Sequence, residues 1–297
     1  MLPLTLRDFE RFRILDESLP HFFEDLRVCW VVTPDQDFHG LSARIGRGRY
    51  RIVRESEIVP EFRYFRGING WFKQQLIKIA IAQRVETDFY LTLDADIICT
   101  KPLRYSDLIQ NGRGKCFIDL FDYHPEYYQW SERVLKLPRS GACHNVTPAV
   151  MSREAMLKMQ NYLCGLARQT KLRIGRRSAL LFGSGLGNRW FPNARVLQGM
   201  RPWAFYLLVS LPWTEYSMYY TFLEATGEFE KYHFRAAHCL CSGNSLWFEN
   251  QIPSWDPRSS FREDDHSFFL VVQSRTAIDP QLVWEKVRPL LKTRFSE

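Results

Sequence analysis

Two carboxylates follow an apolar run in the segment YLTLDAD, residues 90–96. Asp94 and Asp96 are separated by one small residue, so their like charges repel each other and lose hydration if the pair is withdrawn from water. The pair can hold a divalent cation that bridges a nucleotide diphosphate, because Mg²⁺ and Mn²⁺ prefer hard oxygen ligands. Asp94 can instead be a phosphoryl-accepting nucleophile with Asp96 as its acid partner. In a third interpretation the two residues only cap the next turn.

The elements around this pair predict an α/β fold with a mostly parallel sheet. The segment at residues 70–88 has the apolar spacing of an amphipathic helix, and it leads into the continuous apolar run of a strand buried on both faces. Residues 28–33 and 50–60 are earlier strand candidates. In parallel sheets, ligands bind beyond the carboxyl ends of the strands, which is where Asp94 and Asp96 would emerge.

The second half of the chain is less regular. We expect helices at residues 152–169, 214–227 and 279–295, strands at 115–123 and 266–274, and a loop at 236–248. Ser152 and Thr214 have side chains that are preferred at helix N-caps, and a glycine such as Gly227 commonly follows the end of a helix. No repeat or flexible linker divides the chain, so we predict one domain over residues 1–297.

Composition excludes several classes of protein. With 45% hydrophobic residues the chain can bury a large core, and the basic clusters RIGRGRYR and KLRIGRR are too short and separate to indicate nucleic-acid binding. The N-terminus MLPLTLRDFERFR becomes charged before a signal-peptide core, and seven scattered cysteines fit no disulfide framework. We therefore expect a cytoplasmic protein. The net charge of +7, and KLRIGRR in particular, favours anionic partners and a peripheral contact with the anionic inner face of a membrane.

The segment FYLTLDADIICTKPL resembles the DxD region of GT-A glycosyltransferases. The preceding GWFKQQLIKIA, and then CHNVTPAVMSREAM and WTEYSMYYTFLEATG, are similar in order and spacing to a group of bacterial sugar transferases of capsule, lipopolysaccharide or teichoic-acid assembly. The resemblance implies a GT-A-like, Rossmann-type fold with a nucleotide-sugar-binding half at about residues 24–125, an acceptor-binding half at about 126–278 and a C-terminal helix at 279–297. It also implies sugar transfer from a nucleotide-sugar donor, with a UDP-sugar favoured, to a glycan or glycolipid acceptor.

The same resemblance suggests roles for individual residues on the donor side. Asp94 would contact the donor, and Asp96 would be the more direct ligand of Mn²⁺ or Mg²⁺. Thr33 would begin the nucleotide pocket, and Gln74 and Lys78 would reach the donor phosphates or sugar. A further metal ligand is expected from His238 in HCLCSGNSLW, with His266 and His233 as alternatives. Cys239 and Cys241 lack the fourth ligand of a closed zinc site.

On the acceptor side, Glu215 is the candidate general base that removes the proton of the acceptor hydroxyl. Its place in the first turn of a helix is also explained by the helix dipole. His144 and Asn145 would line the acceptor site. Two alternatives remain: a phosphatase of the haloacid-dehalogenase type, although its DxDx[TV] pattern meets Ile at position 98, and a non-catalytic sugar-nucleotide-binding protein.

Overall fold

The computed structural model describes residues 1–297 except 47, 66, 120, 145–146, 183–198 and 293–297, and except the side chains of 170–182 and 292. The strands are β1 Leu2–Pro3, β2 Cys29–Thr33, β3 Tyr50–Arg54, β4 Phe89–Thr92, β5 Ile97–Cys99, β6 Ile109–Gln110, β7 Arg113–Cys116, β8 Ile118–Asp119, β9 Cys143–His144, β10 Ala149–Ser152, β11 His233–Arg235 and β12 Phe269–Val271. The helices are α1 Phe9–Phe22, α2 Phe38–Arg44, α3 Glu55–Ile58, α4 Gly70–Ala80, α5 Tyr105–Leu108, α6 Pro125–Leu135, α7 Arg153–Phe182, α9 Pro202–Val209, α10 Glu215–Ala225, α11 Phe229–Tyr232 and α12 Pro280–Lys292.

The first strands form the parallel sheet that the sequence predicts. β1 and β3 pair in parallel with β2 on its two sides. The backbone of Met1 extends this sheet to β4, because its amino group donates to the Leu91 carbonyl at 2.6 Å and its carbonyl accepts from the Leu93 N–H at 2.9 Å. The predicted α/β class is confirmed, and β4 lies inside the sheet as its apolar sequence indicated.

Beyond β4 the strand directions are mixed. β10 runs antiparallel to β4, with Ala149 opposite Thr92. β10 therefore begins beside the carboxyl end of β4, after the chain has passed through β5–β9. An antiparallel strand of this kind needs no crossover connection to the opposite edge of the sheet. β12 pairs antiparallel with β5, while β11 is parallel to β7.

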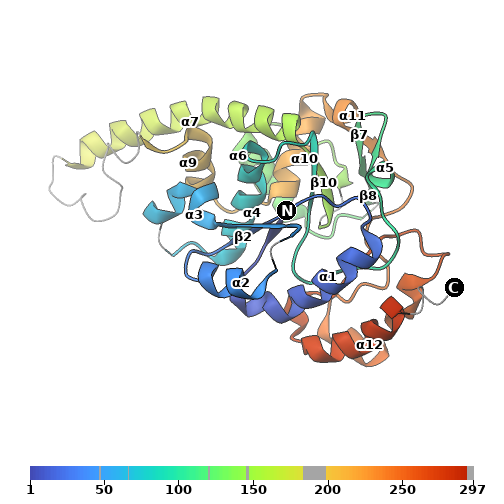
Figure 1. Cartoon of the computed structure of the whole chain (residues 1–297). Coiled ribbons are helices and arrows are strands. Elements are labelled where there is room, and N and C mark those ends of the chain that lie inside the picture. The colour runs from blue at the N-terminus through green and yellow to red at the C-terminus, as the bar shows by residue number, and fades with distance from the viewer. Residues whose placement is uncertain (47, 66, 120, 145–146, 183–198, 293–297) are drawn as a thin grey trace.

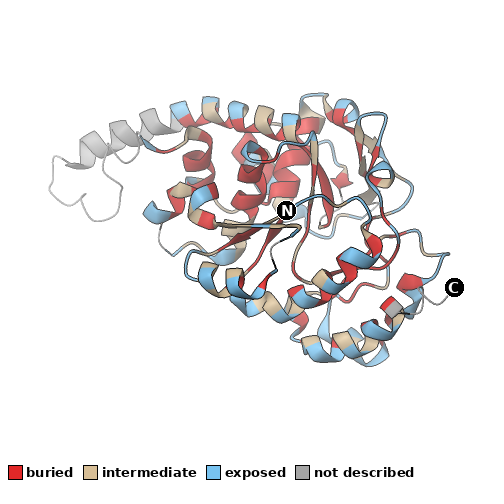
Figure 2. Cartoon of the chain, viewed as in Figure 1, coloured by how far each residue is buried: buried red, intermediate tan, exposed pale blue. Residues whose placement is uncertain are grey.

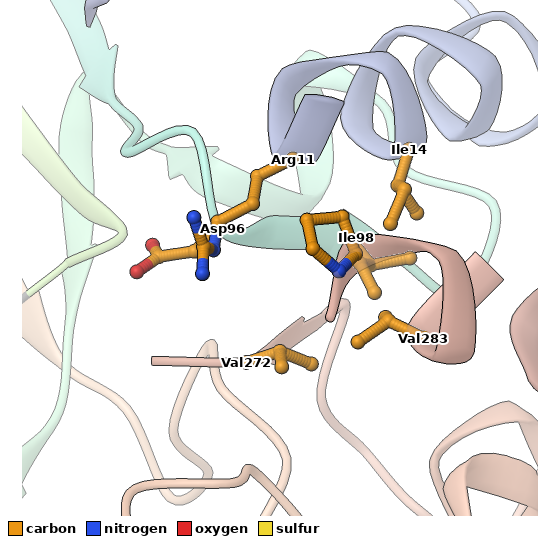
Figure 3. A pocket seen from close by; sticks show the side chains of 7 residues that line it. Arg11, Ile14, Asp96, Ile98, Val272 and Val283 are labelled. Atoms are coloured by element: carbon orange, nitrogen blue, oxygen red, sulfur yellow. The ribbon is translucent and has the colours of Figure 1, made fainter. Parts of the chain in front are cut away.

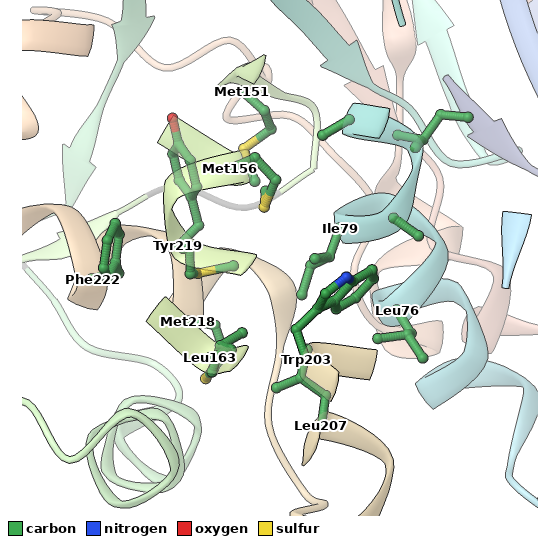
Figure 4. Packing of buried hydrophobic residues seen from close by; sticks show 14 of the residues in the cluster. Leu76, Ile79, Met151, Met156, Leu163, Trp203, Leu207, Met218, Tyr219 and Phe222 are labelled. Atoms are coloured by element: carbon green, nitrogen blue, oxygen red, sulfur yellow. The ribbon is translucent and has the colours of Figure 1, made fainter. Parts of the chain in front are cut away.

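Alternation along the strands creates a hydrophobic core on each face of the sheet. Val31 and Val150 face one core and Val32 and Met151 the other, as expected where successive side chains point to opposite faces. Figure 4 shows the core that packs against α4, α7, α9 and α10, with Trp203 beside Leu76 and Ile79. The opposite core lies under α1 and α12, and the buried residues in Figure 2 line the inner faces of these layers.

The predicted helix boundaries agree well with the structure at their starts. The Ser152 hydroxyl accepts from the Ala155 N–H at 3.3 Å, and Thr214 caps α10 by accepting from the Ser217 N–H. The segment at 70–88 gives a shorter helix, α4, followed by a 3-10 turn. β1 and α1 precede the first strand that the sequence predicts. None of the described helices has the length and apolar character to span a lipid bilayer.

Candidate active site at the end of strand β4

A buried lysine joins two carboxylates at the carboxyl end of β4. Lys78, in the last turn of α4, is only 2% exposed, and its Nζ lies 2.9 Å from Asp94 Oδ1 and 3.0 Å from Glu215 Oε1. Glu215 is the first residue of α10, which packs against α4 (Figure 1). Three residues predicted from separate segments of the sequence therefore meet in one cluster, the Lys78 triad of Lys78, Asp94 and Glu215.

The charges of the Lys78 triad explain why a lysine can be buried here. Burial by itself lowers the pKa of Lys78, but the Asp94 and Glu215 carboxylates outweigh it and hold the pKa well above the ordinary value. Lys78 therefore stays charged, and its Nζ contacts the carboxylates of Asp94 and Glu215. Its predicted contact with donor phosphates stays a prediction, as does that of Gln74, which is half-buried on the same helix.

Asp94 and Asp96 are held differently. The Asp94 side chain is 32% exposed, with Oδ1 on Lys78, whereas Asp96 Oδ2 accepts from the Ser274 N–H at 2.8 Å. Burial and the neighbouring Asp94 charge raise the pKa of Asp96 to about 6. The Ser274 side chain and the Asp96 backbone also hydrogen-bond to the Asp96 carboxylate. The pair therefore brings two like charges together at the end of β4, with Asp94 partly open to solvent.

Glu215 is fully buried, whereas a general base that contacts its substrate directly must be accessible. Its exposed fraction is 0%, and apart from the ion pair with Lys78 its carboxylate oxygens have no hydrogen-bond donor among the described residues. Burial raises its pKa, against the opposing effect of Lys78. The Gln75 side chain accepts the Glu215 N–H at 3.3 Å, which ties the start of α10 to α4. Its predicted role as base is chemically suitable, but this conformation gives an acceptor no access to it.

The hydroxyl groups that surround Lys78 were not predicted from the sequence. The Tyr216 hydroxyl lies 3.0 Å from Thr92 Oγ1, 2.5 Å from Thr147 Oγ1 and 3.3 Å from Lys78 Nζ. Thr92 is the last residue of β4, and Tyr216 directly follows Glu215. Their positions next to predicted site residues were the only available signal, because a buried hydroxyl network has no characteristic spacing.

Several other predicted residues are not part of this cluster. Thr33 is fully buried at the end of β2, and its hydroxyl lies 3.5 Å from the Pro34 carbonyl. His238 is exposed, with its ring 4.4 Å from that of His266. In the described part of the chain, no three His, Cys, Asp or Glu side chains form a group that could hold a metal ion. The structure therefore does not bring His238 to Asp94 and Asp96 as a ready third ligand.

Two other histidines named from the sequence, His233 and His144, are part of the core. His233 is 0% exposed, with Nε2 2.8 Å from the Tyr219 hydroxyl and Nδ1 3.1 Å from the Gly114 carbonyl, and burial lowers its pKa to about 3. His144 stacks on Tyr220 at 4.3 Å and is 5% exposed, so it does not line an acceptor surface. Asn145 and the side chains of KLRIGRR are outside the described residues.

A small pocket lies behind Asp96, between α1, β5 and α12. Ile14, Ile98, Val272 and Val283 line it together with Pro280 and Arg11. The Asp96 carboxylate points away from these apolar side chains (Figure 3). The pocket is thus a feature of packing between the two helices, and the chemistry of Asp96 faces the other way.

Comparison with known proteins places the chain in a family. A model described as "Family of unknown function (DUF6492)" matches residues 1–294. The chain belongs to this family. No curated protein matches the sequence.

Two solved structures resemble this one along nearly the whole chain. Mouse xyloside xylosyltransferase 1, in its apo form, has 12% identity and a TM-score of 0.44, with 94% of this chain and 98% of that chain covered. Galactosyltransferase LgtC, in complex with donor and acceptor sugar analogues, has 11% identity and a TM-score of 0.45, with 97% and 94% covered. Similarity this weak assigns no activity, so the activity is inferred from the site itself.

Proposed function

We propose that this protein is a metal-dependent glycosyltransferase that moves a sugar from a nucleotide-sugar donor to a hydroxyl of a glycan or glycolipid. The observation that carries the proposal is the carboxylate pair at the carboxyl end of β4, where Asp94 and Asp96 lie one residue apart and Asp94 is 32% exposed beside the Lys78 cation. A UDP-sugar donor and an acceptor of the bacterial surface are the finer parts of this proposal, and they rest on the resemblance of the DxD region.

The residues present fit Mn²⁺ or Mg²⁺. Both ions prefer carboxylate oxygens, and Mg²⁺ sites commonly use one or two carboxylates plus substrate phosphates, so a third protein ligand is not required. Burial and then the neighbouring Asp94 charge raise the pKa of Asp96, and a divalent cation would offset the repulsion between the two carboxylates. When bound, the metal would neutralise charge on the leaving diphosphate.

The protein's own groups would bind and orient the reactants. Asp94 and Asp96 would hold the cation, and Lys78 would fix Asp94 through the 2.9 Å ion pair. Glu215 would position Lys78, since it is enclosed behind that side chain. Direct proton removal by Glu215 stays a prediction that requires the start of α10 to open toward the acceptor.

Nucleotide titration tests the proposal. We expect calorimetry with UDP, GDP, CMP and ADP to show Mn²⁺-dependent binding of one nucleotide, because Asp96 would hold the cation and the cation would offset the charge of the nucleotide phosphates. Asp96→Ala should weaken this binding at least about tenfold, since even indirect partners of a metal contribute that much to affinity. The matched control is Asp264→Ala, whose carboxylate is 69% exposed and pairs only with Arg262 among the described residues; it should bind like the wild type. Binding that ignores both Mn²⁺ and Asp96→Ala would refute the metal-dependent transferase.

A further inference from the structure

Three rings form a row at the N-terminal ends of α4 and α6. The Trp71 and Tyr127 ring centroids are 5.8 Å apart with their planes 36° apart, and those of Tyr127 and His124 are 5.1 Å and 32° apart. Trp71 and Tyr127 are half-buried, and the His124 side chain is 63% exposed. The rings are thus only partly covered, and we call the three residues Trp71, Tyr127 and His124 the aromatic shelf.

Helix geometry connects the aromatic shelf to the Lys78 triad. Trp71 precedes Lys78 by seven residues on α4, so the two side chains share one helix face and lie about 10 Å apart along its axis. On α6, Ser131 is four residues beyond Tyr127 on the same face, and its hydroxyl lies 2.7 Å from that of Ser217 in the first turn of α10. Lys78 on α4 and Ser131 on α6 both contact the first turn of α10, where Glu215 lies. Trp71 and Tyr127 are each within two helical turns of these contact residues.

The chemistry of the shelf suits a sugar better than a protein helix. Aromatic faces carry a negative quadrupole that attracts the weakly positive C–H groups on one side of a pyranose ring. His124 Nδ1 lies 3.3 Å from Glu126 Oε1, so polar atoms that can hydrogen-bond to sugar hydroxyls lie beside the rings. Phe121 and Tyr123, 66% and 72% exposed, lie on the chain segment before α6. A groove that binds a protein helix is lined by apolar side chains, whereas the shelf consists of three rings with polar atoms beside them.

We propose that Trp71, Tyr127 and His124 form the acceptor subsite, on which a sugar ring of a glycan acceptor stacks. The inference rests on the proposed transferase function and names the acceptor side of the same site. The distance along α4 leaves room for the transferred sugar at Asp94 and for the first acceptor ring over Trp71. It also replaces His144, which the aromatic core encloses, as the residue of the acceptor side.

Sugar binding to variants tests the shelf separately from the donor site. The probes are maltose, lactose, cellobiose and chitobiose, observed by saturation-transfer NMR with and without UDP and Mn²⁺. We expect at least one disaccharide to bind, Trp71→Ala and Tyr127→Ala to weaken it about tenfold, and Trp71→Phe to restore most of the affinity, because a ring is what the sugar contacts. The control Trp130→Ala, at a 36% exposed tryptophan of α6 outside the shelf, should bind like the wild type.

The outcomes separate the two proposals. If the wild type binds no nucleotide, the transferase function fails, whatever the disaccharides show. If nucleotide binding is intact but no disaccharide binds, or if Trp71→Ala and Tyr127→Ala bind it as the wild type does, the acceptor subsite is refuted. A loss of nucleotide affinity in Trp71→Ala would mean that the shelf stacks the donor base, and this also overturns the inference.

Discussion

Lys78→Met is expected to lower the free energy of unfolding by about 3–5 kcal/mol, because removing one partner of a buried ion pair leaves the other charge uncompensated. Lys78 is the cation beside Glu215, whose exposed fraction is 0%. Urea unfolding followed by circular dichroism measures the effect. The same variant should lose nucleotide binding, since Asp94 would no longer be held in place.

Two further variants distinguish this explanation from a simple packing defect. Arg13→Met removes an ion pair whose side chains are 64% and 59% exposed, and should change stability by less than about 1 kcal/mol. The double variant Lys78→Met with Glu215→Leu should recover most of the loss, because it removes the stranded buried charge while Asp94 stays 32% exposed to water. A Lys78→Met protein as stable as the wild type, or a double variant no more stable than the single one, would contradict the electrostatic account.

The stability of the protein should fall in mild acid because of His233. Its pKa is lowered from 6.5 to about 3, since burial disfavours the charged ring, so it stays neutral in the folded protein while the unfolded chain takes up a proton. Stability from the neutral ring is fully present above pH 6.5 and is lost as pH falls toward 3. Between about pH 7 and about pH 4.5 the contribution of His233 to this loss should be about 3 kcal/mol.

The prediction is tested by the difference between two proteins. Urea unfolding of His233→Gln at both pH values should show a fall in stability about 3 kcal/mol smaller than that of the wild type. His144, whose pKa is also lowered by burial, is present in both proteins, so its effect cancels. His39→Gln, at an exposed position, should keep the acid sensitivity of the wild type. Equal losses in wild type and His233→Gln would show that the ring does not stay neutral in the fold.

The sequence by itself determined the local elements and part of the site. The apolar run before Asp94 predicts an inner strand, and the carboxyl end of that strand is where the pair lies in the structure. Cap residues fixed the starts of α7 and α10, because their side chains satisfy backbone N–H groups one turn away. β1 escaped prediction because two residues are too few to show a period, although Met1 links the sheet to β4.

The tertiary structure alone decided which charges meet. Periodicity places Lys78 and Gln74 on the polar side of a helix, but only packing against α10 turns Lys78 inward, onto Glu215 and Asp94. It likewise buries His233 and His144 and leaves His238 exposed. The physical reason is that a helix or strand pattern fixes a side chain's direction only relative to its own axis. Its partners depend on how the elements pack, which involves residues more than a hundred positions apart.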